Sequence, residues 1–279
     1  MRTLDVLTII DEIAQMCIHM NYYVDDQLMK ALKIAKQEET SELGRNILGQ
    51  IIENDEIAAR KHVPMCQDTG IVVVYADFGE ELQVVGNLEA AINEGIRRGY
   101  KDGYLRKSVV RHPLDRVNTK DNTPAVIHYA RIPGNQLRLT IAAKGAGSEN
   151  QSQLRMLKPS EGYRGVKQMV LDTVLQAGGN PCPPIIVGVG VGGSFEKCAL
   201  IAKEALMRPL DDVSDDEIAV KLEQELLAEI NELNVGPMGF GGKTTALAVK
   251  VNIYPCHIAA LPVAVNIQCH ASRHLMKFF

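Results

Sequence analysis

The sequence predicts an α+β fold in which an N-terminal helical layer precedes a mixture of helices and small sheets. Apolar residues recur at helical spacing over residues 1–60, and short apolar runs typical of buried strands follow. Some of these runs are joined by tight turns and others by helical segments, so a fully parallel, doubly wound sheet is not expected. We expect a single domain over residues 1–279, with a helical start and a mixed α/β remainder.

The helical start rests on one amphipathic pattern and two further helical segments. The first pattern places Cys17 on its buried stripe, and the later segments cover residues 25–36 and 41–60. The stripe consists of Val6, Ile9, Ile10, Ile13, Cys17 and Met20.

The remaining elements are expected from period, turn residues and caps. Residues 125–132 and 136–144 are expected to form an antiparallel hairpin through Pro133-Gly134-Asn135, and Ser194 is expected to cap a helix that ends at Met207. The other expected strands are 71–78, 185–191, 245–253 and 263–268, and the other expected helices are 88–98, 160–176 and 217–233.

Composition excludes several classes of function. The formal net charge of −4 does not favour a nucleic-acid or acidic-lipid partner, so an anionic substrate would need a local group of Arg and Lys side chains. No apolar run reaches the roughly 18 residues of a membrane span, and the start has no secretory signal pattern. We therefore expect a cytoplasmic protein without membrane or nucleic-acid partners.

The cysteines allow two interpretations. In the cytoplasm they should be reduced, so each is either a small buried hydrophobe or a ligand for a soft metal centre. Cys66, Cys182 and Cys269 lie at breaks in regular structure, whereas Cys17 and Cys198 lie within helical patterns. Three thiolates on a four-iron cluster would leave one iron open as a Lewis acid. Composition alone does not choose between these interpretations.

Five segments resemble the motifs of class I fumarases and the related tartrate dehydratases. The resemblance runs over nearly the whole chain, in the same order. The segments are Cys66-Gln67-Asp68-Thr69-Gly70, residues 118–125 (NTKDNTPA), residues 143–150 (AKGAGSEN), Asn180-Pro181-Cys182-Pro183-Pro184 and Cys269-His270-Ala271-Ser272-Arg273.

The resemblance implies a cofactor and a set of site residues. It implies a [4Fe-4S] cluster held by Cys66, Cys182 and Cys269. The implied substrate-binding residues are Gln67, Asp68, Arg106 and Gly147, and the implied catalytic residues are Asp68 and His257. From the residues alone, Arg106 would be interpreted as a solvated surface residue, and His257 as a structural residue of a turn. No role is assigned to Cys256, His270 or His274.

The resemblance also implies an activity, the reversible hydration of fumarate to malate, a reaction of the tricarboxylic acid cycle. The alternatives are the alpha subunit of a tartrate dehydratase and a subunit that holds a cluster without turnover. A purely structural cluster would not need Gln67, Asp68 and Arg106 beside it, and this favours an enzyme.

A partner is expected because the chain stops shortly after Cys269, at Phe279, whereas single-chain members of the family continue into a second domain. The chain therefore resembles the alpha subunit of the two-subunit form. We expect a separate beta subunit to complete a site for a small dicarboxylate in a hetero-oligomer.

Two glycine-rich segments partly match the templates of nucleotide sites. Gly188–Gly193 fits a dinucleotide-binding template weakly, because the acids that follow do not lie at a strand end, and a turn that packs closely is expected instead. Gly241–Thr244 resembles the end of a phosphate loop, but Pro237 stands where that template requires glycine.

Overall fold

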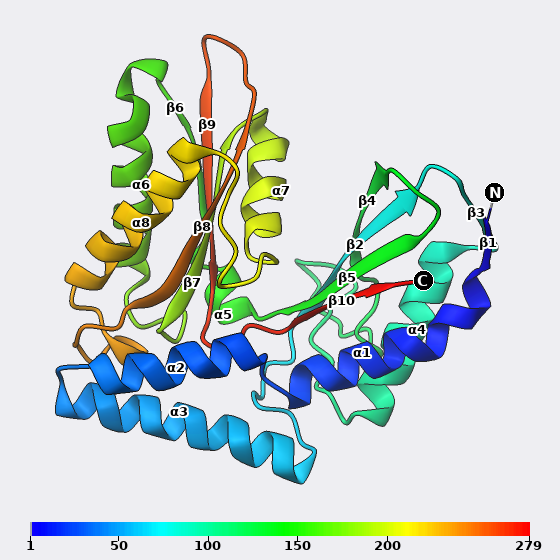
Figure 1. Ribbon diagram of the computed structural model, residues 1–279. Coiled ribbons are helices and arrows are strands. Elements are labelled where there is room, and N and C mark those ends of the chain that lie inside the picture. The colour runs from blue at the N-terminus through cyan, green and yellow to red at the C-terminus, as the bar shows by residue number, and fades with distance from the viewer. Residues whose placement is uncertain (1) are drawn as a thin grey trace. The chain divides into compact units, whose positions relative to one another are not determined.

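The computed structural model describes residues 2–279 and divides the chain into two compact units (Figure 1). Of the described residues, unit 1 comprises 2–24, 54–146 and 273–279, and unit 2 comprises 25–53 and 147–272. Helices and mixed sheets occur in both, which confirms the α+β class. The expectation of one domain over the whole chain stays a prediction. Among the described residues, no helix is long and apolar enough to cross a membrane.

Unit 1 is built on a four-stranded mixed sheet. The strand order is β10-β5-β2-β4, with β2 antiparallel to β5 and parallel to β4. A separate two-stranded sheet pairs β1, at the start of the chain, in parallel with β3. The bounds are β1 Arg2–Asp5, β2 Ile71–Gly79, β3 Leu82–Val85, β4 Val126–Ile132, β5 Leu137–Lys144 and β10 His274–Phe278.

The predicted antiparallel hairpin is wrong in its pairing, although both of its strands exist. Strands β4 and β5 do not pair with each other, because β2 lies between them. Val73 of β2 faces Val126 on one side and Ala142 on the other. The reason is burial: β2 is apolar along nearly its whole length and needs neighbours on both edges, whereas β4 is largely exposed and suits the sheet edge.

Two helices cover the sheet of unit 1. Helix α1 (Ile10–Tyr22) packs against α4 (Leu88–Asp102), and the short 3₁₀ helix η1 (Val6–Ile9) leads into α1. Their apolar faces join the inner face of the sheet in one core, in which Ile13, Ile92 and Ile141 have no exposed surface. This core confirms the predicted buried stripe of α1, including Cys17.

Unit 2 is built on a second mixed sheet of four strands. The order is β6-β9-β7-β8, with β7 parallel to β8 and antiparallel to β9. Strand β6 pairs antiparallel with the outer edge of β9. The bounds are β6 Gln153–Leu157, β7 Ile185–Gly192, β8 Ala246–Tyr254 and β9 Leu261–Gln268.

Helices flank both faces of the sheet in unit 2. Figure 1 shows α6 and α8 on one side and α7 on the other, and the two sides have separate apolar cores. Helix α2 packs near β8, and α3 belongs to unit 2 as far as Glu53. The bounds are α2 Asp26–Glu38, α3 Glu42–Lys61, α5 Ala146–Glu149, α6 Gly162–Ala177, α7 Phe195–Ala205, α8 Glu217–Glu232, η2 Pro159–Glu161 and η3 Pro237–Gly239.

The glycine run 188–193 lies mainly within β7 and is not the turn expected from the sequence. A Cβ on Gly188 would lie 2.2 Å from the Ala202 carbonyl oxygen, and one on Gly190 would lie 2.1 Å from that of Cys198. These glycines therefore let α7 approach the strand closely. Ser194 does precede α7, but its hydroxyl contacts Glu196 and makes no capping hydrogen bond.

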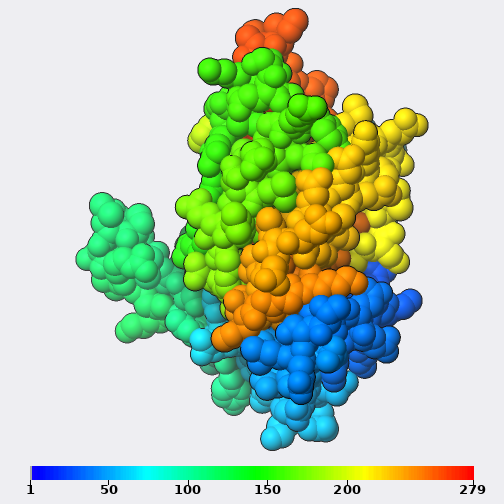
Figure 2. Space-filling view, turned by 90° about the vertical axis from the view of Figure 1, so that its left-hand side faces the viewer, coloured from blue at the N-terminus to red at the C-terminus, as the bar shows by residue number. Residues whose placement is uncertain are grey.

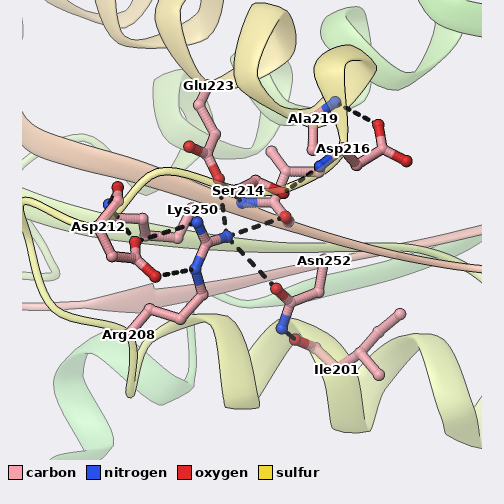
Figure 3. A network of polar contacts seen from close by, with 10 residues as sticks. Ile201, Arg208, Asp212, Ser214, Asp216, Ala219, Glu223, Lys250 and Asn252 are labelled. Carbon is pink, nitrogen blue, oxygen red and sulfur yellow. Dashed lines mark hydrogen bonds and ion pairs between the residues drawn. The ribbon is translucent and has the colours of Figure 1, made fainter.

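A polar network ties the segment after α7 to β8 and α8 (Figure 3). The Arg208 guanidinium contacts Asp212 and Glu223, and the nearly buried Lys250 ammonium lies 2.7 Å from Asp212 Oδ1. Asp216 caps α8 by accepting hydrogen bonds from the backbone amides of its first turn. Burial opposes ionisation of Asp212, but Arg208 and Lys250 outweigh it and lower its pKa.

Candidate active site

The Cys66–Gly70 loop follows α3 and leads into β2 in unit 1. Cys66 is half-buried and Gln67 is exposed. The Asp68 carboxylate shapes the loop: Oδ1 accepts a hydrogen bond from the Gly70 amide at 3.0 Å, and Oδ2 accepts one from the Ala146 amide at 2.8 Å. Each oxygen keeps further lone-pair capacity, so Asp68 can organise the loop and still contact a ligand.

Arg106 lies on a segment bound to this loop. The Thr69 hydroxyl donates to the Arg106 carbonyl oxygen at 2.7 Å, which links the backbone next to Asp68 to the backbone of Arg106. The Arg106 side chain is exposed, so its guanidinium is available to a carboxylate. Unit 1 therefore places Cys66, Gln67, Asp68 and Arg106 on two directly connected segments.

Unit 2 brings Cys182 and Cys269 to one end of its sheet. Cys182 precedes β7 and Cys269 follows β9, and these strands are antiparallel with Ile186 opposite Gln268. The backbone amide of His270 donates to the Cys182 carbonyl oxygen at 3.4 Å. The sequence placed both cysteines at breaks in structure, and the strand pairing explains why two distant breaks meet.

Gly147 lies at the same end of this sheet, in α5. A Cβ on Gly147 would lie 3.6 Å from the Asn180 carbonyl oxygen, which is ordinary van der Waals contact. Packing within unit 2 therefore does not require glycine here. The expectation that Gly147 lets backbone approach a ligand stays a prediction.

His257 is not brought to Cys269. It lies in the exposed turn between β8 and β9, where its Nδ1 accepts a hydrogen bond from the Ala259 amide at 3.1 Å. The whole of β9 separates it from Cys269, roughly 25 Å at about 3.3 Å per residue. Cys256 is exposed in the same turn. Within this chain, His257 therefore cannot act on a ligand held at Cys269.

Burial separates the predicted ligands from the other cysteines. Cys66, Cys182 and Cys269 are all partly exposed, whereas Cys17 and Cys198 are buried. Burial raises the pKa of the Cys17 thiol to about 12 and also raises that of Cys198, and a metal binds the thiolate form. The three partly exposed thiols are thus a donor set that suits an iron–sulfur cluster.

The structure divides these donors between the units, with Cys66 in unit 1 and the other two in unit 2. Among residues 2–279, no three His, Cys, Asp or Glu side chains are grouped closely enough to hold a metal ion. Joint ligation by the three cysteines is therefore a prediction.

Two residues next to Asp68, Gly145 and Arg273, were not predicted to belong to the site. A Cβ on Gly145 would lie 3.1 Å from Asp68 Oδ2 and 3.5 Å from Arg273 Nη2, so this glycine leaves room for both side chains. Both Gly145 and Arg273 fall within segments that carry the family resemblance, and this was the available signal. Their roles depend on contacts with the distant Asp68.

A second missed group anchors the α5 turn in unit 2. Glu149 accepts hydrogen bonds from Lys203 Nζ at 2.5 Å and from Asn266 Nδ2 at 2.8 Å. Asn266 Nδ2 also donates to the Ser152 hydroxyl oxygen at 2.8 Å. Because Lys203 lies in α7 and Asn266 in β9, these contacts fix the turn that carries Gly147 onto the sheet end near Cys269.

Comparison with known proteins identifies the relatives of this chain. The sequence model of the family described as fumarate hydratase (fumerase) matches residues 10–277. A Methanocaldococcus jannaschii protein, provisionally named L(+)-tartrate dehydratase subunit alpha, is 40% identical over 278 residues, covering 97% of each chain. The L(+)-tartrate dehydratase subunit alpha of Escherichia coli K12 is 30% identical over 252 residues, covering 89% of this chain and 83% of the relative.

Proposed function

The chain belongs to the fumarate hydratase (fumerase) family, and from that premise we propose that it is the iron–sulfur subunit of a hydro-lyase that converts fumarate to malate reversibly. The observation that supports this proposal most is the position of the cysteine thiols and of the side chains that could bind an anion. Cys66 lies beside Gln67 and Asp68 on a loop bound to the Arg106 segment, and Cys182 lies with Cys269 at one sheet end.

The proposed cofactor is a [4Fe-4S] cluster held by Cys66, Cys182 and Cys269. Their partial exposure at the ends of regular elements supports this assignment over the buried Cys17 and Cys198. When bound, a cluster with three protein ligands supplies an open iron that acts as a Lewis acid on a substrate oxygen.

The chain's own residues would bind and orient the dicarboxylate. The exposed Arg106 guanidinium presents a planar fork to one carboxylate, and the Gln67 amide donates to a second oxygen. Gly147 would let the substrate approach its backbone closely. Asp68, whose carboxylate is held by two backbone amides, would act as an acid or base at a fixed position.

We propose that a separate beta subunit completes the site in a hetero-oligomer and supplies the base. The alpha-subunit names of the relatives support this partner. Because His257 lies at the far end of β9 from Cys269, any catalytic role for it would be toward substrate bound by another chain of the assembly.

Tartrate is the second candidate substrate, favoured by the names of both relatives. Fumarate and tartrate are both four-carbon dicarboxylates, so Arg106 would serve either. If fumarate is the substrate, we propose that the reaction belongs to the tricarboxylic acid cycle. We propose a cytoplasmic location for the protein. A cluster-holding subunit without turnover would leave the exposed Arg106 and Gln67 without a role.

The deciding experiment is anaerobic reconstitution of the chain with ferrous iron and sulfide, together with its beta subunit, followed by parallel assays of fumarate hydration and tartrate dehydration. We expect fumarate to be the better substrate and the isolated chain to turn over neither acid appreciably. A preference for tartrate would make tartrate the substrate in place of fumarate. A complex with an intact cluster but no hydro-lyase activity would refute the proposed function.

A variant assay assigns the binding role. Arg106→Ala should cost about 2 to 4 kcal/mol of transition-state stabilisation, measured as a fall in kcat/KM, because it leaves a bound carboxylate unpaired. Arg111→Ala, on the same segment, is the control and should leave kcat/KM nearly unchanged.

A further inference from the structure

Three consecutive backbone carbonyls of the Cys66–Gly70 loop are each bound by a side chain from a different part of unit 1. The Asp68 carbonyl oxygen accepts from Arg273 Nη1 at 2.6 Å. That of Thr69 accepts from the Tyr100 hydroxyl at 2.5 Å, and that of Gly70 accepts from Asn122 Nδ2 at 3.1 Å. We refer to Arg273, Tyr100 and Asn122 as the carbonyl cradle.

All three members of the cradle are buried. Arg273 is 3% exposed, and Tyr100 and Asn122 have no exposed surface. Hydrogen bonds made away from water are costly to break, because the partner that remains is left unsatisfied. Burial also raises the pKa of Tyr100, so its hydroxyl remains a donor at neutral pH.

Arg273 joins the cradle to two other segments of the chain. Its Nη1 also lies 3.1 Å from the Asn21 side-chain oxygen, and the Asn21 carbonyl accepts from the Met65 amide at 2.9 Å. Contacts from Asn21 and Arg273 therefore flank Cys66 on both sides along the chain. Arg273 itself follows Cys269 by four residues. One short segment therefore contains the proposed ligand Cys269 and also binds the loop that carries the proposed ligand Cys66.

We propose that Arg273, Tyr100 and Asn122 are positioning residues that hold the Cys66–Gly70 loop in the conformation required to bind the cluster and substrate. They bind the loop through its backbone carbonyls, which leaves the side chains of Cys66 and Gln67 unconstrained by these contacts. This inference rests on the proposed function for its purpose, but the geometry of the cradle can be tested without it.

The first test measures hydrogen exchange of the apo full-length chain in the peptide that covers residues 65–70. Tyr100→Phe removes one hydroxyl and keeps the ring, and Arg273→Lys keeps the charge without the guanidinium fork. We expect exchange in this peptide to rise about tenfold in each variant, with peptides of β2 and α4 unchanged. Wild-type exchange rates in both variants would overturn the proposal.

Matched controls separate a local effect from general destabilisation. Tyr22→Phe removes a buried hydroxyl that donates to the Gly103 carbonyl at 2.8 Å, and Arg138→Lys alters an arginine paired with Asp77. Both controls lie in unit 1 and should leave exchange at residues 65–70 at the wild-type rate. Equal acceleration in the controls would show a general effect and would also overturn the proposal.

The second test measures cluster retention in chains reconstituted anaerobically with ferrous iron and sulfide. Addition of an iron chelator should bleach the cluster absorbance about tenfold faster in Tyr100→Phe and Arg273→Lys than in Tyr22→Phe or the wild type. Equal bleaching rates would refute the link to the cluster. A wild-type chain that assembles no cluster would instead refute the proposed function, while the exchange test would still decide whether the cradle holds the loop.

Discussion

Thr244 and Glu39 are joined by a hydrogen bond of 2.8 Å from the Thr244 amide to Glu39 Oε2, across 205 residues of sequence within unit 2. The other oxygen, Oε1, accepts from the amides of Lys243 and Ser41. The backbone amides after Gly242, which the sequence suggested as the end of a phosphate loop, are thus occupied by the chain's own carboxylate. This contact supports the exclusion of a phosphate site there.

Glu39 makes stability depend on pH. Burial opposes ionisation of its carboxyl, but the three backbone amides outweigh it and lower its pKa from the ordinary value of 4.5. A lowered pKa adds stability that is complete above pH 4.5 and is lost as pH falls through the folded-state value. Glu39→Gln should therefore cost about 1 to 3 kcal/mol of unfolding free energy at pH 7 and progressively less below pH 4.5.

Urea unfolding at several pH values measures this effect, with Glu38→Gln as the control. Glu38 is 61% exposed and pairs with Lys243 Nζ at 3.2 Å, so its loss should change the free energy of unfolding by less than about 0.5 kcal/mol. A Glu39→Gln penalty that stays constant from pH 7 to pH 3 would contradict the assignment.

Replacing different members of the network in Figure 3 should destabilise the chain by different amounts. Asp212→Asn should destabilise the chain by about 2 to 4 kcal/mol, because Lys250, 4% exposed, loses its carboxylate partner. Lys250→Met should cost only about 1 kcal/mol, since Asp212 keeps Arg208 and the methionine fills the space. Urea unfolding at pH 7 would measure both variants, and the reverse order of penalties would refute the account.

Lys203 should influence the α5 turn more than an equivalent lysine elsewhere in unit 2. Lys203→Met removes the contact with Glu149, and we expect a fall in kcat/KM of about tenfold in the reconstituted complex because the turn carrying Gly147 loosens. Lys167→Met is a matched control, since both lysine side chains are 18% exposed and ion-paired. If both variants lose the same activity, Lys203 has no special relation to the site.

The cysteine assignment predicts two classes of variant. Replacing Cys66, Cys182 or Cys269 by Ser should abolish the cluster absorbance and the activity of the reconstituted chain. Cys198→Ala should keep both, while lowering the free energy of unfolding by about 1 kcal/mol through loss of buried volume. A full complement of iron and sulfide in Cys182→Ser would remove that residue from the ligand set.

Local patterns in the sequence predicted the positions of most elements. Helix α1 was expected from the spacing of Ile9, Ile13 and Cys17, and strand β2 from its unbroken apolar run. Such elements are predictable because side-chain period and burial are properties of neighbouring residues. The cluster-ligand and Arg106 assignments required the family resemblance, because neither spacing nor charge distinguishes them from core cysteines or a surface arginine.

Tertiary structure decided the pairing of strands and the partners of buried polar groups. Nothing near Val126 indicates that β4 lies beside β2, because strand order depends on which strand most needs to be covered. Likewise, nothing near Glu39 in the sequence indicates its contact with Thr244, and nothing near Arg273 indicates its contact with Asp68. The sequence determined which residues prefer helix, strand or burial, whereas a buried charge is stable only where folding brings it a distant partner.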